Sequence, residues 1–220
     1  MPEKKRPRRT PQRILETSLA LFNRFGEPHI TTADIADEMN ISPGNLYYHF
    51  RNKDDIIGAL YEALERDILP LLSLPEGRAA GVEDLWLLLH LLFERMREYR
   101  FFYRDLDEIT SRNRKIAMRF AGVTRRGENT VIELCRGLVM GGEMRATERE
   151  IAALASNVTL VATYWMSYQR IGAHHGGDAA DGDAAAVSLD RAAYQVLALV
   201  APFLVGDGRA LIERLGQDYL

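Results

Sequence analysis

The sequence predicts an all-α protein. Apolar residues recur at helical spacing along most of the 220 residues, and no segment shows the strict alternation of a half-buried strand. Hydrophobic residues make up 47% of the chain and charged residues 27%, which favours a folded protein over a disordered one. Turn signals separate a group of short helices from a group of long ones. We therefore expect an N-terminal domain of three helices joined to a C-terminal helical bundle.

The N-terminal residues predict a basic arm followed by one amphipathic helix. Residues 1–13 carry six basic side chains and one acidic one, so residues 1–10 are expected to be a flexible arm that contacts a polyanion or is simply solvated. The helix begins near Pro11, which suits a first turn, and ends before Gly26 and Pro28. One face carries apolar or small residues at helical spacing: Ile14, Ser18, Leu21, Phe22 and Phe25.

A second, short helix is predicted over Thr32–Met39. Thr31 is its N-cap, and Asp34 three residues later makes a variant of the capping box. Asn40 follows where the chain must turn, and asparagine tolerates left-handed backbone better than most residues. This helix is therefore expected to end in a tight turn.

A third short helix is predicted over Pro43–His49. Ser42 is its N-cap, and proline suits the first helical position. A fourth helix runs from Lys53 to about residue 70 and connects the N-terminal domain, expected over residues 11–55, to the rest of the chain.

Residues 71–220 are expected to form the larger, C-terminal domain. Pro75, Gly77 and Gly81 mark a hinge at its start, and the glycine-rich stretch Gly172–Gly182 predicts a loop within it. The helices expected here cover Val82–Tyr99, Leu106–Asn113, Lys115–Met140, Thr147–Ile171, Ser188–Val205 and a short segment near Gly208–Leu215.

Two short helices joined by a tight turn beside a longer helix are the sequence pattern of a helix-turn-helix. In such a motif the third helix enters the major groove of double-stranded DNA with its N-terminal residues against base edges. Asn45 can offer a donor and an acceptor to adenine, and Tyr47, Tyr48, His49 and Lys53 are placed to reach phosphates. A small apolar core is expected between the helices: Ile35, Ala36, Met39, Ile41, Leu46 and Phe50. The candidate DNA-binding residues are Arg8, Arg9, Thr31, Thr32, Ser42, Pro43, Gly44, Asn45, Tyr47, Tyr48, His49 and Lys53.

The N-terminal domain resembles the DNA-binding domain of TetR/AcrR transcriptional regulators over residues 11–60. The resemblance rests on the stretch from Thr31 to Lys53, above all on Leu-Tyr-Tyr-His-Phe followed by lysine, and on the helix end Leu-Phe-Asn-Arg-Phe-Gly. Asn40 stands where the family commonly has glycine. The resemblance implies a homodimer that binds a palindromic operator, usually as a repressor, with a C-terminal pocket for a small-molecule effector. Residues 99–106 also resemble a motif of a branch associated with polyhydroxyalkanoate storage and fatty-acid metabolism, which suggests an acyl-type effector.

Aromatic and polar residues at helical spacing in the C-terminal domain are candidates for the effector pocket, although each of them could instead be ordinary core. The candidates are Trp86, His90, Phe93, Phe102, Tyr103, Met118, Asn157, Tyr164, Trp165 and Tyr168. Dimerisation is expected to use the last two long helices, whose apolar stripes could alternatively pack within one chain. The candidates for the dimer interface are Ala162, Met166, Arg170, Val196, Leu199 and Phe203.

The remaining features favour a cytoplasmic protein with no membrane partner and no cofactor or metal. The longest apolar runs fall short of the roughly 18 residues that cross a bilayer, and no apolar segment of a signal peptide follows the basic N-terminus. Cys135 has no partner cysteine and reads as a small apolar residue, and His174, His175 and Asp178 lie in the glycine-rich loop, where solvation is favoured over metal binding. The alternative is a small all-α ligand-binding protein or enzyme whose N-terminal helices do not read DNA, although the sequence contains no phosphate-binding loop, no paired nucleophile and base, and no carboxylate cluster.

Overall fold

The computed structural model describes residues 10–74, 77–173 and 182–216, and the side chains of residues 170–190 and 215–216 fall outside this description. The described residues form helices and contain no strand, so the predicted all-α class is confirmed. The helices are α1 (Thr10–Phe25), η1 (Glu27–His29), α2 (Thr32–Glu38), α3 (Pro43–His49), α4 (Lys53–Ile68), α5 (Val82–Glu98), α6 (Arg100–Arg104), α7 (Leu106–Arg112), α8 (Arg114–Met140), α9 (Glu148–Ala173), α10 (Gly182–Val200), η2 (Ala201–Phe203) and α11 (Gly206–Gly216).

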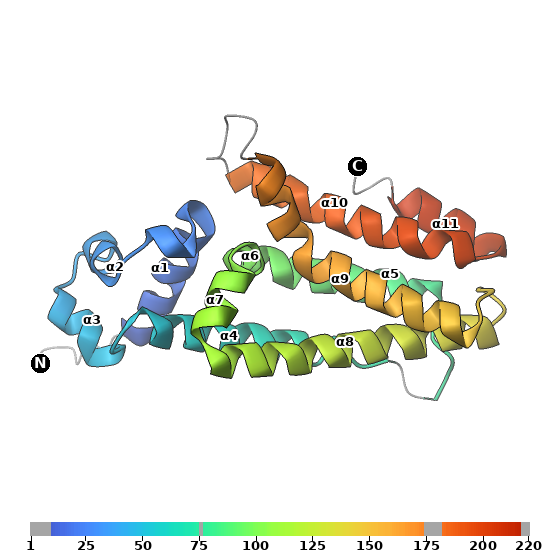
Figure 1. Cartoon of the computed structure of the whole chain (residues 1–220), viewed down its shortest axis with the longest axis horizontal. Helices are drawn as coiled ribbons and strands as arrows, with labels where there is room; N and C mark the ends of the chain where they lie inside the picture. Colours follow the sequence, from blue (N-terminus) through green and yellow to red (C-terminus); the bar gives the residue numbers. More distant parts are fainter. Residues whose placement is uncertain (1–9, 75–76, 174–181, 217–220) are drawn as a thin grey trace, which may run out of the picture.

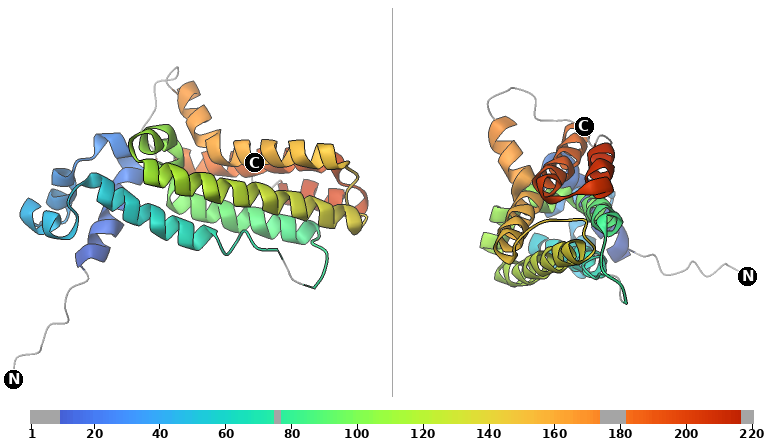
Figure 2. Two further views of the ribbon diagram at one scale, coloured as in Figure 1. Left: turned by 60° about the horizontal axis from the view of Figure 1, so that its bottom comes forward. Right: turned by 90° about the vertical axis from the view of Figure 1, so that its right-hand side faces the viewer.

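The molecule is elongated, with α1–α3 at one end and the long helices along the rest of its length (Figure 1). Helix α4 leads from the small end into the bundle, where α8 packs on α9, α9 on α10, and α10 on α5. The two views in Figure 2 keep these long helices side by side, so they form one bundle around a shared apolar core.

Helix α1 buries the face that the periodicity predicts, with one exception. Ile14, Ser18 and Phe22 are fully buried, whereas Phe25 is exposed. Phe25 is the last residue of the helix, and the positive φ of 94° at Gly26 turns the chain there. Its ring lies 4.8 Å from the guanidinium of Arg24 instead of in the core.

The C-terminal helices differ from the prediction in two places. Residues 100–104 form a separate short helix, α6, between α5 and α7. Helix α10 begins at Gly182 and ends at Val200, so the predicted helix over residues 188–205 starts later and runs further than the one observed. It ends early because the backbone of residues 203–205 bonds to the turn after α8, where Arg145 donates to the Phe203 carbonyl and Val205 donates to the Glu143 carbonyl, both at 2.9 Å.

Candidate functional site

The turn between α2 and α3 is held by side chains that cap both helices. The backbone N–H of Asp34 donates to Thr31 Oγ1 at 3.2 Å, and the Asp34 carboxylate accepts from the backbone N–H of Thr31 at 2.7 Å. The hydroxyl and the N–H of Thr31 hold the pKa of Asp34 below its ordinary value. Asn40 has the left-handed backbone that the sequence predicts, with φ of 54°. At α3 the backbone N–H of Asn45 donates to the Ser42 hydroxyl at 3.2 Å. These caps give hydrogen-bond partners to backbone N–H groups in the first turn of each helix, which have none within the helix, and they fix the angle of the turn.

A compact apolar core joins the two short helices. Ile35, Ala36 and Leu46 are fully buried, and Met39 is nearly so. The small side chain of Ala36 allows α2 and α3 to cross closely. Because Leu46 points inward, the remaining residues of the seven-residue helix α3 project mainly outward.

The outer face of α3 is polar, aromatic and exposed. Tyr48 is 84% exposed and Tyr47 is 50% exposed, with the Tyr47 hydroxyl 3.0 Å from Thr32 Oγ1. The structure thus places Thr32 beside the predicted α3 residues, and His49 is half-buried with its ring 5.0 Å from that of Tyr48. Five more of the predicted DNA-binding residues are exposed on this surface, namely Thr31, Ser42, Pro43, Gly44 and Asn45. Arg8 and Arg9 lie outside the described residues.

Lys53 requires a correction, because its ammonium group is used inside the protein. Its Nζ donates to the carbonyl oxygens of Glu27 and Ile30, each at 3.0 Å, and lies 2.8 Å from the buried carboxylate of Glu27. A lysine has three donors, and these three contacts use them all. In this geometry Lys53 has no donor left for a phosphate, so its role is to hold α4 against the turn after α1.

The N-terminal helices are joined to the bundle by a second group of buried polar contacts. The side-chain amide of Asn23 donates to the Glu98 carbonyl at 2.7 Å and accepts from the Phe101 N–H at 3.0 Å. Arg104 donates to the carbonyl of Phe22 at 2.7 Å. These contacts tie the end of α1 to the short helix α6.

Glu27 adds to these contacts between the N-terminal helices and the bundle, which together form the junction of the two parts. Its backbone N–H donates to the Asp105 carboxylate at 3.0 Å, and its buried side chain accepts from Arg112 at 2.8 Å as well as from Lys53. Arg104 also pairs with Asp105 at 3.2 Å. The carboxylate of Glu27 therefore connects η1 to both α4 and α7.

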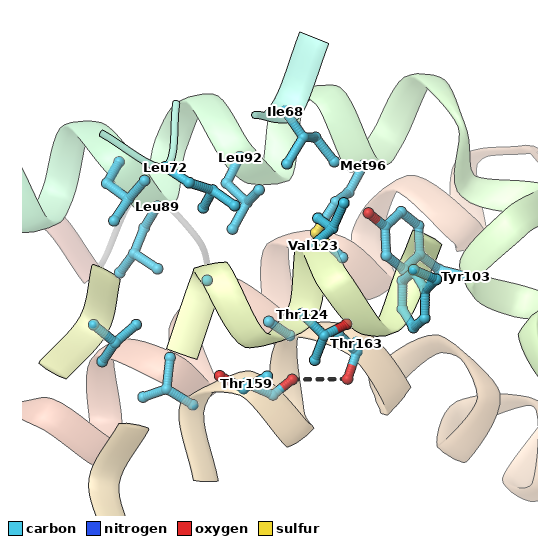
Figure 3. Close-up of a pocket in the computed structure, with 16 residues that line it drawn as sticks. Ile68, Leu72, Leu89, Leu92, Met96, Tyr103, Val123, Thr124, Thr159 and Thr163 are labelled. Atoms are coloured by element: carbon cyan, nitrogen blue, oxygen red, sulfur yellow. Dashed lines mark hydrogen bonds between the residues drawn. The ribbon is translucent and has the colours of Figure 1, made fainter. Parts of the chain in front are cut away.

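A cavity of about 70 Å³ lies in the bundle between α4, α5, α6, α8 and α9. Sixteen residues line it, and most are aliphatic, including Leu89, Leu92 and Val123. Four carry hydroxyl groups, namely Tyr103, Thr124, Thr159 and Thr163 (Figure 3). The cavity is a candidate small-molecule site, because such sites are concave and mostly apolar with a few polar groups.

Helix α6 lies between this cavity and the N-terminal helices. Tyr103 lines the cavity, whereas Phe101 and Arg104 of the same five-residue helix bond to the end of α1. The ring of Phe101 also lies 5.3 Å from that of Phe22. A movement of α6 would therefore change both the wall of the cavity and the contacts with the end of α1.

Two comparisons of sequence place the chain in a family. Residues 14–60 match the family described as bacterial regulatory proteins of the tetR family, and residues 63–212 match the family described as TetR, bacterial transcriptional repressor. The chain belongs to the TetR family.

Individual proteins that are similar to this chain are also TetR-family regulators or repressors. A solved TetR-family transcriptional regulator from Marinobacter aquaeolei VT8 is 34% identical, covers 96% of this chain and 99% of that chain, and has a TM-score of 0.82. A probable acrEF/envCD operon repressor of Escherichia coli K12 is 33% identical over 90 residues, which are 41% of this chain and 37% of that protein. The match thus spans less than half the length of this curated relative. SmeT, the repressor of the Stenotrophomonas maltophilia multidrug efflux pump SmeDEF, shares the fold with a TM-score of 0.54 at 17% identity, over 90% of this chain and 92% of SmeT.

Most of the predicted pocket residues lie outside the candidate cavity. Of the ten, Tyr103 alone lines the cavity. Phe93 and Phe102 are buried in the core, and Trp86 stacks on the exposed His90 with ring centroids 5.1 Å apart. The others lie on or near the surface of α8 and α9: Met118, Asn157, Tyr164, Trp165 and Tyr168. The candidate cavity is walled mainly by leucine, valine and threonine, which the aromatic spacing did not indicate.

Of the six predicted dimer residues, two are buried within the single chain and three are half-buried. Met166 and Val196 are buried within the single chain, and Ala162 lines the cavity. Leu199 and Phe203 are half-buried against the same core, and the side chain of Arg170 lies outside the described residues. Helices α9 and α10 pack against each other within the chain, and this packing leaves Ala162, Leu199 and Phe203 partly exposed.

The described residues contain no cluster of three or more His, Cys, Asp or Glu side chains placed to hold a metal. His174, His175 and Asp178 lie outside that part of the chain. Cys135 is buried in α8, and burial raises the pKa of its thiol to about 11. Within the same described ranges, no helix is both long enough and apolar enough to cross a bilayer.

Proposed function

We propose that this TetR-family chain is a homodimeric repressor that binds a palindromic DNA operator through α3 and releases it when a small molecule occupies the cavity. The observation that carries the DNA-binding role is the exposed polar and aromatic face of α3, which two helix caps hold in a fixed orientation. A helix presented in this way can enter the major groove, where Asn45 would pair with adenine and Tyr47 and Tyr48 would reach the backbone. Such a regulator acts where its DNA is, in the cytoplasm. In this proposal residues 1–10 are the DNA-contacting arm, 11–55 the DNA-binding domain, and 71–220 the effector and dimerisation domain.

The exposed face of α9 supports a dimer. Leu160, Tyr164 and Tyr168 are exposed at helical spacing, and exposed apolar side chains in a row are typical of a contact surface. Two copies of α9 and α10 would form a four-helix interface that places the two α3 helices about 34–36 Å apart, one turn of DNA. Sedimentation should show a dimer that Leu160→Glu dissociates, whereas Leu87→Glu on the exposed face of α5 should leave it intact.

Helix α6 supplies the route from the cavity to the DNA. An effector that favours one position of Tyr103 would bias the contacts that Phe101 and Arg104 make with α1, and so shift the population of dimers whose α3 helices match the operator spacing. The expected effector response is weaker DNA binding without dissociation of the dimer.

Fluorescence anisotropy on DNA from upstream of the protein's own gene tests the DNA-binding role. The wild type should prefer that duplex over a scrambled one at two salt concentrations, because phosphate contacts alone are sequence-independent and salt-sensitive. Asn45→Ala should reduce the preference by roughly 5- to 100-fold. Asn129→Ala, a matched change at an exposed position of α8, should leave it unchanged. Equal binding to both duplexes, or none, would favour the alternative of a ligand-binding protein or enzyme whose N-terminal helices do not read DNA.

A further inference from the structure

The lining of the cavity favours uncharged ligands over charged ones. None of its sixteen lining residues carries a charge, and the nearest polar groups are hydroxyls. An ionised carboxylate or ammonium placed there would lose its water without gaining a counter-charge, which is among the most unfavourable transfers in proteins. The cavity therefore excludes charged ligands by its chemistry.

The polar groups in the cavity are placed unevenly. Tyr103, Thr124 and Thr163 gather in one half, Leu72, Leu89 and Leu92 occupy the other, and Thr159 lies between the two groups (Figure 3). The cavity thus has a hydrocarbon end and an end that can form hydrogen bonds.

Thr124 is the polar group that most requires a ligand. Its Oγ1 is buried and has no hydrogen-bond partner among the described residues. Thr163 differs, because its hydroxyl already donates to the Thr159 carbonyl at 2.7 Å. A buried hydroxyl without a partner costs free energy that a ligand oxygen would recover.

Tyr103 can act as a second donor in the same half of the cavity as Thr124 (Figure 3). Burial raises the pKa of its phenol, with a further contribution from Tyr61, so the group stays protonated at neutral pH. Two hydroxyl donors at one end of a cavity suit a carbonyl oxygen, which can accept two hydrogen bonds.

The size of the cavity implies that a ligand must widen it. Its volume of about 70 Å³ is smaller than the ~150 Å³ that admits benzene in a dry protein cavity. A larger molecule must separate α5, α8 and α9 or displace Tyr103, and α6 carries Tyr103.

We infer that the effector is an uncharged carbonyl compound with a hydrocarbon tail, of the ester, ketone or lactone class, whose oxygen bonds to Thr124 and Tyr103. This inference rests on the proposed function for its regulatory meaning, but the ligand chemistry can be tested without DNA.

The test uses three probes that share an eight-carbon chain and differ in their polar end. Calorimetry with the purified protein should show that methyl octanoate binds about 100-fold more tightly than octanoate or octyltrimethylammonium, because neither ion finds a counter-charge. Thr124→Val and Tyr103→Phe should each weaken binding of the ester roughly 3- to 10-fold. Thr110→Val is the matched control and should change it less than about 2-fold, because Thr110 lies on α7 outside the cavity and its hydroxyl donates to the Leu106 carbonyl of its own helix.

The result that overturns the inference is an octanoate or ammonium affinity equal to that of the ester. No ester binding to the folded protein, or ester binding that neither Thr124→Val nor Tyr103→Phe alters, would overturn it as well. Anisotropy on operator DNA then separates the two proposals. Ester binding without operator release supports the ligand chemistry and contradicts the effector role, whereas a chain that fails to bind DNA but binds the ester contradicts the DNA-binding role alone.

Discussion

Helices α2 and α3 and the cavity of the bundle present their functional residues in opposite ways. The short helices turn polar and aromatic side chains outward, and local caps at fixed sequence offsets hold them, such as Thr31 with Asp34 and Ser42 with Asn45. The cavity is a space between five helices, and its residues come from positions between 68 and 163. A surface built on local contacts can be located from sequence, whereas a space between distant helices depends on how they pack.

The junction around Glu27 and Asn23 connects these two regions and combines both kinds of contact. Its residues are polar and buried, and partners such as Asn23 and Phe101 lie 78 positions apart in the chain. Substitutions that break this junction, or the helix caps, test how far the short helices and the cavity depend on one another.

Lys53→Met should have the largest effect. The Glu27 carboxylate is fully buried, and losing one of its two cationic partners should lower the free energy of unfolding by about 3 kcal/mol. Chemical denaturation measures this change. Lys115→Met is the matched control, because Lys115 is exposed and lies 3.7 Å from Glu62, so it should cost less than about 0.5 kcal/mol.

The same variant separates a structural Lys53 from one that binds phosphate. A phosphate contact would instead leave the unfolding free energy unchanged. It would weaken DNA binding across all sequences and reduce the slope of log affinity against log salt by about 1.

Asn23→Ala should have an intermediate effect and test the junction itself. It leaves the Glu98 carbonyl and the Phe101 N–H without their buried partner, which should lower the free energy of unfolding by about 2 kcal/mol. It should also raise the effector concentration needed for half-release of operator DNA, since α6 loses a bond to α1. Asn129→Ala on the surface of α8 should change neither quantity, and an unaltered effector response in Asn23→Ala would show that α6 does not transmit the signal.

Asp34→Asn should have the smallest effect and a defined pH dependence. The pKa of Asp34 is lowered in the folded chain, so its carboxylate contributes stability that is present above its ordinary value of 3.8 and is lost as pH falls through the lowered pKa. The thermal midpoint of the wild type should therefore exceed that of Asp34→Asn at pH 7, and the difference should shrink as the pH falls below 3.8. A difference that is constant with pH would mean that the charge of Asp34 does not contribute to the cap.

Local signals explain where the sequence-based prediction succeeded. The predicted bounds of α3 agree with the structure at both ends, because Ser42 and Pro43 mark its start and Phe50 takes an extended backbone after it. The left-handed turn at Asn40 was likewise predicted from one residue and its position. In both places the residues that decide the conformation are neighbours in the chain.

The prediction failed where a distant partner decides the outcome. Helix α6 was missed because it has five residues and no side-chain cap, and the bond from Phe101 N–H to Asn23 holds its start from 78 residues away. Lys53 was expected to point toward DNA because its position in the motif says nothing of the buried Glu27 beside it. Tyr164 and Tyr168 were expected in a pocket because helical spacing reveals a face but not which neighbour covers it.

The sequence alone determined the all-α class, the helix-turn-helix with its caps, and the residues that α3 turns outward. These features follow from propensities and hydrogen bonds between residues a few positions apart. The tertiary structure decided which faces of α9 and α10 are buried, where the cavity lies, and how α6 links it to α1. Those outcomes depend on the fit of long amphipathic helices, each with more than one apolar face, and packing selects among these faces only when all the helices are present together.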